Sequence, residues 1–289
     1  MVVDLPMNAS DSVIEGPVLR ERAKSARELL RCCTMCEHRC GIDRASGAHS
    51  PCGLGAETWS YKRHVSFSEE LELLPSYMVY LSGCNFRCRF CVQGPTCFSP
   101  TAGQRVEPRE LAGELQRIIS RGAKTINLLG GEPSLHLHTI LELAAESPEP
   151  LPLVLNSNMY MTVEVLRLLE GVVSIYLGDF KFGNDACAQR IAGVERYVEV
   201  VTRNLTIASE QAHVMIRHLL MPGHFECCLV PVAEWVAANL PQATFSLMTS
   251  YVPAWRAAED AHGLDRCTTE DEGEQARRFV AQLGLKRSD

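Results

Sequence analysis

Nine of the 13 cysteines in this 289-residue chain fall between Cys32 and Cys97, and they form two groups that are spaced like metal ligands. One group reads Cys84-x3-Cys88-x2-Cys91. Three thiols in a loop-like segment can converge on one metal ion or cluster, and thiolates are the ligands of iron–sulfur centres. A structural zinc ion would need a fourth protein ligand, which Cys97 could supply. Buried cysteines without a metal are a further interpretation of the spacing alone.

The other group comprises Cys33-x2-Cys36-x3-Cys40 and, further along the chain, Cys52. Cys32 could take the place of Cys33 in any assignment. Four thiols at these spacings predict a second metal site, but the spacing does not choose between a structural zinc ion and an iron–sulfur cluster. Residues 32–60 are rich in Cys, Gly, His and Pro without periodicity, as expected for a loop-rich module that folds around its ligands.

The charge and the N-terminal sequence limit the partners and the location of the chain. A formal net charge of −7 and a pI near 5.8 would not attract a polyanion, so we expect a small-molecule or protein partner and neither nucleic acid nor a membrane. The chain begins without a basic and apolar signal segment, and it has no run of about 18 apolar residues. We therefore expect a cytoplasmic location, where clustered thiols indicate metal binding or catalysis before disulfides.

From about residue 76 the chain alternates β-rich runs with amphipathic stretches of helical period. Strands are predicted at 77–81, 125–129, 151–155, 172–177, 213–220 and 244–248. Helices are predicted at 21–31, 108–121, 135–146, 162–170, 186–209 and 226–239. Strand and helix in alternation predict a parallel sheet, and six units are fewer than the eight of a complete barrel. The prediction is an α/β fold with a partial (β/α)6 TIM-like barrel.

These elements divide the chain into four predicted parts. Residues 1–31 form a leader with a short helix, and residues 32–75 form a cysteine-rich module for an auxiliary cluster. Residues 76–256 form the barrel, and residues 257–289 form a polar C-terminal extension with a helix at about 269–284.

Polar residues follow the predicted strands at the end where parallel-sheet enzymes collect their chemistry. The second strand ends in Gly130-Gly131-Glu132-Pro133, and the next ones end in Asn156-Ser157-Asn158, Asp179-Phe180-Lys181 and Arg217-His218. Helix caps or surface ion pairs are the alternative roles for these residues. Neighbouring strand residues point to opposite faces, so one of Arg217 and His218 is expected to turn away from the barrel.

The triad Cys84-x3-Cys88-x2-Cys91, with Phe90 before its last cysteine, resembles the signature of the radical S-adenosylmethionine (radical SAM) superfamily. Gly130-Gly131-Glu132-Pro133 resembles the second motif of that superfamily. The later strand ends and the cysteine-rich N-terminal segment are similar to the branch that contains pyruvate formate-lyase activating enzyme and its relatives.

This resemblance implies a [4Fe–4S] cluster on Cys84, Cys88 and Cys91, with one iron left open for SAM. Reductive cleavage of SAM would give a 5′-deoxyadenosyl radical that abstracts hydrogen from a substrate, with an electron donor such as flavodoxin or ferredoxin. Nine further residues are implied to contact or position SAM: Gly130, Gly131, Glu132, Asn156, Asn158, Asp179, Lys181, Arg217 and His218. Because such a chain already depends on cluster assembly, the resemblance favours an auxiliary iron–sulfur cluster over zinc at Cys33, Cys36, Cys40 and Cys52.

The reaction after hydrogen abstraction stays open at this point. We favour a small, secondary metabolite as substrate, with the auxiliary cluster as redox relay, substrate anchor or sulfur donor. One alternative is an activase that installs a glycyl radical on a partner protein, and another is a non-catalytic zinc or iron–sulfur protein. Cys187 and Cys227-Cys228 begin predicted helices, so they could donate hydrogen to a substrate radical or be small buried residues. His136 and His138 are expected to be solvated or capping residues.

Overall fold

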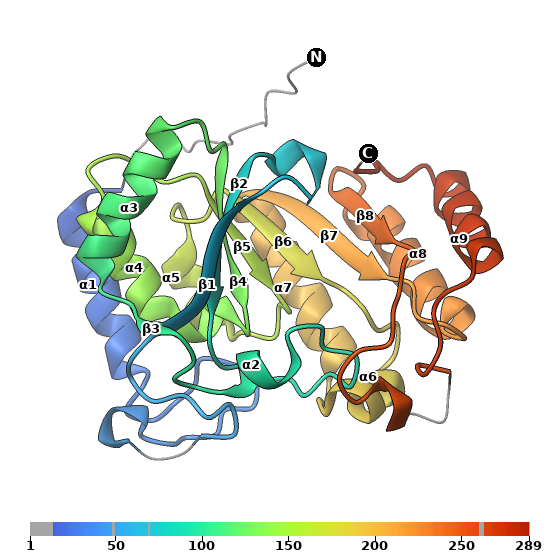
Figure 1. Cartoon of the computed structure of the whole chain (residues 1–289), viewed down its shortest axis with the longest axis horizontal. Coiled ribbons are helices and arrows are strands. Elements are labelled where there is room, and N and C mark those ends of the chain that lie inside the picture. The colour runs from blue at the N-terminus through green and yellow to red at the C-terminus, as the bar shows by residue number, and fades with distance from the viewer. Residues whose placement is uncertain (1–13, 48–49, 69, 260–262, 289) are drawn as a thin grey trace.

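The computed structural model describes residues 14–47, 50–68, 70–259 and 263–288. Within them eight strands form one sheet in the order β3-β1-β2-β4-β5-β6-β7-β8 (Figure 1). Its strands are β1 Trp59–Ser66, β2 Ser76–Leu81, β3 Gln104–Arg105, β4 Thr125–Gly130, β5 Leu153–Ser157, β6 Ile175–Asp179, β7 His213–Leu219 and β8 Thr244–Met248. The strands β2, β4, β5, β6, β7 and β8 pair in parallel, whereas β1 is antiparallel to both β2 and β3.

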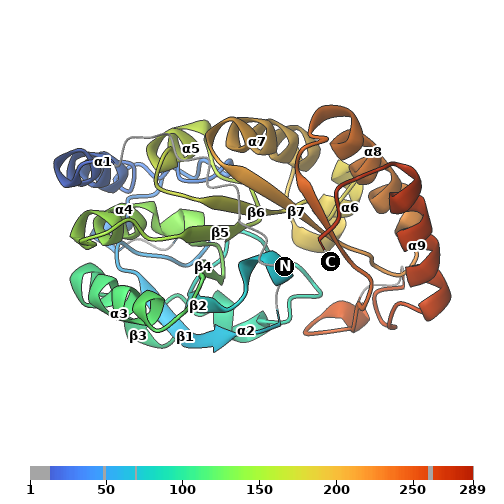
Figure 2. The same cartoon turned by 90° about the horizontal axis from the view of Figure 1, so that it is seen from above.

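The helices are α1 Gly16–Glu28, α2 Gly94–Phe98, α3 Pro108–Ser120, α4 Leu137–Glu146, α5 Val163–Leu169, α6 Asp185–Ala192, α7 Tyr197–Gln211, α8 Val230–Asn239 and α9 Glu270–Gln282. Helices α3, α4, α5, α7 and α8 cover the outer side of the curved sheet, and α1 packs on α4 (Figure 2). Short turns are η1 Arg44–Ser46, η2 Leu71–Leu73, η3 Pro133–His136, η4 Phe225–Leu229 and η5 Ala257–Glu259. None of the helices in this described part of the chain is long and apolar enough to span a bilayer.

The predicted α/β fold with a partial six-unit barrel is confirmed. The six parallel strands coincide with the predicted ones to within a few residues, and the sheet remains open between β3 and β8. The sequence analysis missed β1, whose residues are mostly half-buried and alternate weakly. β1 extends the barrel sheet from within residues 32–75, and the division of the chain at residue 75 stays a prediction. Residues 1–13 of the predicted leader lie outside the described residues.

Two predicted helices differ from the observed ones for local reasons. The single helix predicted over 186–209 is wrong: it is interrupted after Ala192 because Gly193 takes a left-handed conformation with φ of 73°. The helix predicted over 21–31 begins earlier, at Gly16, with Pro17 in its first turn, where a missing N–H removes no helical bond. It then packs on α4, where Arg27 forms an ion pair with Glu142.

The segment between β1 and β2 closes the end of the barrel opposite to the strand exits. Leu73 of η2 is fully buried in one cluster with Val154, Ile175, Leu177 and Met215 from β5, β6 and β7. Burying a leucine contributes about 1.5–3 kcal/mol, so this contact stabilises the strands against one another. The polar strand exits lie at the other end of the barrel.

Candidate functional site

One cavity of about 500 Å³ lies at the carboxyl ends of the parallel strands. Eleven of the residues singled out in the sequence line it: Cys84, Cys88, Cys91, Gly130, Gly131, Glu132, Asn156, Asn158, Asp179, Lys181 and Arg217. They follow β2, β4, β5, β6 and β7 or end those strands, so the parallel sheet brings together residues more than a hundred positions apart. The apolar side of the cavity includes Phe90, Phe182 and Tyr251.

The loop after β2 carries the three cysteines of the triad. The Phe86 backbone N–H points at the Cys84 sulfur, 3.4 Å away. The loop is also fixed from outside, because the backbone N–H groups of Arg87 and Arg89 donate to the carbonyls of Ala192 and Ile191 at the end of α6, at 3.0 and 2.9 Å. The sulfurs are thus held on a loop that has little freedom to move away from the cavity.

Burial dominates the electrostatics of two of these thiols. It raises the pKa of Cys84 well above its usual value and that of Cys88 to about 12, although Lys181 beside Cys88 opposes the shift. The Cys97 sulfur lies 3.7 Å from the sulfur of Cys91, and this contact lowers the pKa of Cys91. Cys97, which the sequence offered as a possible fourth ligand, therefore lies beside the triad and lines the same cavity.

The glycines of the Gly-Gly-Glu-Pro loop are required by the neighbouring loop. A Cβ on Gly131 would lie 1.8 Å from the carbonyl oxygen of Gly83, and one on Gly130 would lie 2.5 Å from the backbone of Leu81. The backbone N–H of Gly131 donates to the Leu81 carbonyl, and that of Glu132 donates to Gly83. The absence of side chains thus lets the loops after β2 and β4 touch.

Glu132 joins the loop after β4 to the end of β5. Its buried carboxylate accepts hydrogen bonds from the Ser134 N–H at 3.1 Å, the Ser157 hydroxyl at 2.7 Å and the Asn158 N–H at 2.8 Å. Asn158 in turn donates from its side-chain amide to the Asn85 side chain at 2.7 Å. Glu132 borders the cavity, but its oxygens are used to join the exits of β4 and β5, and Asn158 joins these to the exit of β2.

Asp179 and Lys181 form an ion pair at the end of β6, with 2.5 Å between the Lys181 Nζ and an Asp179 oxygen. Burial acts to lower the pKa of Lys181, but Asp179 and the neighbouring Cys88 raise it overall, so the ammonium stays charged. The Lys181 backbone N–H donates to the Tyr197 hydroxyl, which donates to the Asp179 carbonyl. A cation and an anion are therefore fixed side by side at the cavity wall.

Arg217 and His218 point to opposite faces of β7, as the strand geometry requires. Arg217 lines the cavity, where it forms a two-point ion pair with the buried Glu70 at 2.8 and 2.6 Å. His218 is buried on the other face, donates from Nδ1 to the Phe180 carbonyl, and has a pKa lowered by burial to about 4. His218 does not border the cavity, so a direct contact with a ligand there has no geometric support. Glu70 was missed because it lies 147 residues from Arg217 in the sequence.

Cys33, Cys36, Cys40 and Cys52 gather in the loops between α1 and β1. Cys33, Cys36 and Cys52 are buried, Cys40 is half-buried, and the alternative ligand Cys32 is exposed. Burial raises the pKa of Cys36 to about 12, and Cys52 and Cys33 are close enough to add to that shift. The pKa of Cys40 is likewise raised, by burial and by the neighbouring Cys33 and Cys52. The four thiols therefore lie in one neighbourhood, and none of them lines the cavity.

This cysteine-rich segment is attached directly behind the barrel site. The backbones of Glu37 and Tyr160 are hydrogen-bonded, and so are those of Thr162 and Met35, so the segment pairs with the loop after β5. His38 bonds to the carbonyl of Asn85, the residue that follows Cys84. The cysteine-rich segment thus contacts the loop that carries the triad.

Several other predicted residues lie away from the cavity. Cys187, Cys227 and Cys228 do not line it, so transfer of hydrogen from any of them to a substrate inside has no geometric support. The expectation that His136 and His138 are solvated is wrong, because both are buried, whereas His136 does occupy the N-cap position of α4, without a capping hydrogen bond from its side chain. His136 bonds to the Thr58 hydroxyl and the Ser82 carbonyl, and burial lowers its pKa to about 3.

Comparison with known sequences identifies the family. The family model described as the radical SAM superfamily matches residues 78–236. An uncharacterized protein of Methanocaldococcus jannaschii is 33% identical over 278 residues, which cover 94% of this chain and 81% of that protein. A 7-carboxy-7-deazaguanine synthase of Methanothermobacter thermautotrophicus is 31% identical over 97 residues, which cover 34% of this chain and 39% of the enzyme.

Solved structures show the same fold at low sequence identity. The Streptococcus suis protein SuiB bound to S-adenosylmethionine aligns with a TM-score of 0.54 and 12% identity, over 71% of this chain and 47% of that one. SuiB bound to its precursor peptide SuiA aligns with a TM-score of 0.53 over 71% of this chain and 46% of that one. The chain thus spans about half the length of these structures.

Proposed function

The chain belongs to the radical SAM superfamily, and we propose that it uses Cys84, Cys88 and Cys91 to generate a radical for a reaction on a small molecule held in the barrel cavity. The family supplies the enzyme class and the two cofactors, a [4Fe–4S] cluster and SAM. One observation carries the assignment to these residues: the three thiols and the polar ends of four other strands line a single cavity.

The residues present fit the cofactors. Three thiols are the ligand type of an iron–sulfur cluster. When bound, the cluster and SAM together supply the 5′-deoxyadenosyl radical. The chain itself has to bind SAM, orient it and keep water away.

Different residues are assigned to these tasks. Lys181 offers a positive charge for the carboxylate of SAM, and Asp179 holds the lysine in place. Asn156 and Asn158 present amide groups at the end of β5. Glu132 acts as a positioning residue, because its oxygens already accept bonds from the protein. Phe90, Phe182 and Tyr251 cover the apolar side and exclude water.

The size of the cavity supports a small substrate. Pockets that enclose one small ligand typically have volumes of about 300–1,000 Å³. Here about 500 Å³ lies at the strand exits, where SAM also has to bind. A metabolite fits the space that remains better than a folded partner domain does.

We assign an auxiliary iron–sulfur cluster to Cys33, Cys36, Cys40 and Cys52. Four thiols can hold either a zinc ion or an iron–sulfur cluster, and the dependence of a radical SAM chain on cluster assembly supports the cluster. Of the possible roles, the geometry favours a redox relay. Because the four thiols lie behind Asn85 and not along the cavity, they are poorly placed to anchor a substrate or to donate sulfur to it.

Anaerobic reconstitution with iron and sulfide tests the proposal. We compare the wild-type chain with the Cys84→Ala/Cys88→Ala/Cys91→Ala variant. The control is Cys32→Ala/Cys267→Ala, which replaces two exposed cysteines. Each protein is analysed for iron, sulfide, zinc and the reductant-dependent formation of 5′-deoxyadenosine. We expect the product from the wild type and the control, and none from the triad variant, which keeps its N-terminal iron. Equal cleavage by the triad variant would overturn the assignment.

A further inference from the structure

A third group of metal-binding side chains lies outside the cavity, between α6 and η4. One ligand atom each of Cys187, His224 and Cys227 lies within 4.8 Å of the other two. The sulfurs of Cys187 and Cys227 are 3.9 Å apart, and those of Cys227 and the fully buried Cys228 are 3.8 Å apart. Soft ligands are thus concentrated at a site that the proposed radical chemistry does not use.

The backbone around these residues takes two unusual forms that bring them together. The segment Phe225–Leu229 is a single π turn, in which the N–H groups of both Cys228 and Leu229 donate to the His224 carbonyl. Such turns recur at functional sites. A Cβ on Gly183 would lie 2.7 and 2.8 Å from the carbonyls of Cys227 and Cys228. The glycine therefore permits the contact between the segment that precedes α6 and this turn.

Neighbouring polar groups fix the orientation of the ligands. Asn184 caps α6 by accepting from the Cys187 N–H at 2.8 Å, and its amide donates to the Cys227 carbonyl at 2.8 Å and to the Cys187 sulfur at 3.4 Å. His224 donates from Nδ1 to the Pro222 carbonyl at 2.8 Å. Its Nε2 accepts from Arg190, since a guanidinium can only donate. Metal-binding histidines are commonly oriented by a carbonyl in this way, with the lone pair left on the other nitrogen.

We propose that Cys187, Cys227 and His224, whose ligand atoms converge, bind one zinc ion, with Cys228, whose sulfur is 3.8 Å from that of Cys227, as its fourth ligand. In a tetrahedral site with Zn–S bonds of about 2.3 Å, the sulfurs lie about 3.8 Å apart, which matches the two separations observed here. Three thiolates and one histidine are a common donor set of structural zinc. Binding releases the three thiol protons and replaces the hydrogen bond from Arg190 to Nε2. Arg190 then lies beside a centre with one net negative charge, which its own charge balances.

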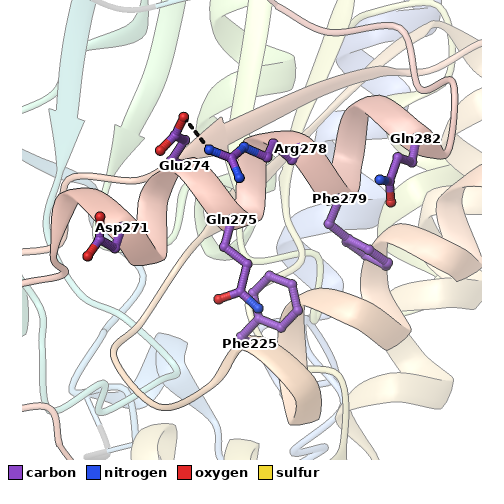
Figure 3. Close-up of a pocket in the computed structure, with 7 residues that line it drawn as sticks. All are labelled: Phe225, Asp271, Glu274, Gln275, Arg278, Phe279 and Gln282. Atoms are coloured by element: carbon purple, nitrogen blue, oxygen red, sulfur yellow. Dashed lines mark ion pairs between the residues drawn. The ribbon is translucent and has the colours of Figure 1, made fainter.

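This ion would position the catalytic loop through α6. The helix begins at the proposed zinc site and ends at Ile191 and Ala192, whose carbonyls accept the N–H groups of Arg89 and Arg87 in the loop of the cysteine triad. On its other side, η4 is supported by α9. Figure 3 shows Phe225 beneath Gln275 and Phe279 at a surface groove, and the rings of Phe225 and Phe279 are 5.6 Å apart. The zinc ion would therefore fix a turn that is already held by α9.

The test measures metal in the full chain purified without oxygen, before SAM is added. Zinc and iron per chain are determined for the wild type, Cys187→Ser, Cys227→Ser and the control Cys267→Ser, which replaces an exposed cysteine. We expect the first two variants to lose one zinc ion per chain and the control to keep it, with iron unchanged in all. Because no SAM cleavage is measured, this outcome is independent of the proposed reaction.

A second measurement uses the wild type alone, in case the variants fail to fold. Thiols are alkylated before and after treatment with a zinc chelator, and the labelled residues are identified by mass spectrometry. We expect Cys187, Cys227 and Cys228 to gain label together when zinc is removed. The proposal is overturned if their labelling does not depend on the chelator, if zinc content is equal in all variants, if the site holds iron, or if Cys187 and Cys227 form a disulfide in the anaerobic protein.

Discussion

The two cysteine groups in the first third of the chain differ in number and in what they face. The triad of Cys84, Cys88 and Cys91 lines the barrel cavity, whereas the N-terminal set of four thiols lies behind the loop that carries the triad. Three thiolates leave one iron of a four-iron cluster without a protein ligand, and four leave none. In the proposed assignment the number of thiols agrees with their access to the cavity, because the centre with an open iron is the one at the cavity.

Loss of one triad ligand has the largest expected effect on this comparison. Cys88→Ala removes a thiol that faces Lys181 in the cavity wall, and 5′-deoxyadenosine formation should fall below detection because the open cluster cannot be held. Product is measured by chromatography after anaerobic reconstitution. Cys267→Ala, at an exposed position, serves as the control and should keep full activity. Retention of most of the activity by Cys88→Ala would remove the distinction between the two groups.

Loss of one N-terminal ligand should separate the two centres. Cys36→Ala should lower the iron content by one cluster while SAM cleavage stays within a few-fold of the wild type when a chemical reductant supplies the electron directly, because the triad and the cavity are unchanged. The adjacent exposed Cys32→Ala is the matched control and should keep all its iron. Iron analysis and the cleavage assay are done on the same samples. Abolished cleavage in a folded Cys36→Ala protein would contradict a division of roles.

A smaller effect is expected at the SAM-binding wall. Lys181→Met removes a buried ammonium and leaves Asp179 unpaired beside the site for the SAM carboxylate. A hydrogen bond to a charged group contributes about 1.5–3 kcal/mol, so SAM should bind roughly 10- to 100-fold more weakly. Equilibrium binding of SAM to the reconstituted protein measures this. Lys24→Met, which removes an exposed lysine from α1, is the control. Equal affinities would exclude Lys181 from the site.

The smallest effect concerns the ion pair beneath the cavity. Burial acts to raise the pKa of Glu70, but Arg217 lowers it overall, so the folded chain binds this proton less tightly than the unfolded chain. The stabilisation is therefore present above the ordinary glutamate pKa of about 4.3 and is lost as the pH falls towards the lowered value. Glu70→Gln should reduce the thermal midpoint at neutral pH, and the difference from the wild type should shrink below about pH 4.

The control for that series is Glu259→Gln, which breaks an exposed ion pair with Arg256 and should leave the midpoint almost unchanged. A difference between Glu70→Gln and the wild type that is constant from neutral to acidic pH would contradict the assignment of the effect to the charge of Glu70.

The sequence predicted the repeating elements well and the convergent contacts poorly. The six parallel strands carry strong β-rich runs, and their exits necessarily meet at one edge of a parallel sheet, which is why most of the cavity residues could be predicted. The antiparallel strand β1 has a half-buried pattern without a clear period, so it was missed. The prediction of one helix over 186–209 was wrong because Gly193, in a left-handed conformation, ends the helix although the helical period continues beyond it.

Contacts between distant segments left no local signal. The pair of Glu70 and Arg217 depends on how the barrel sheet curves. The approach of Cys187 to Cys227 depends on one π turn. The cysteines were noticed as residue types, but their separation of about 3.9 Å required the folded chain. The need for glycine at position 131 also appears only in the folded chain, where the missing side chain admits the Gly83 carbonyl of the neighbouring loop.

The most direct test of the central claim is electron paramagnetic resonance of each reduced centre on its own, with and without SAM. The Cys33→Ala/Cys36→Ala/Cys40→Ala/Cys52→Ala variant retains only the triad, and the Cys84→Ala/Cys88→Ala/Cys91→Ala variant retains only the N-terminal set. We predict that SAM changes the spectrum of the first variant, whose cluster has an open iron, and leaves that of the second unchanged. A SAM-dependent change in the second variant, or none in the first, would contradict the account.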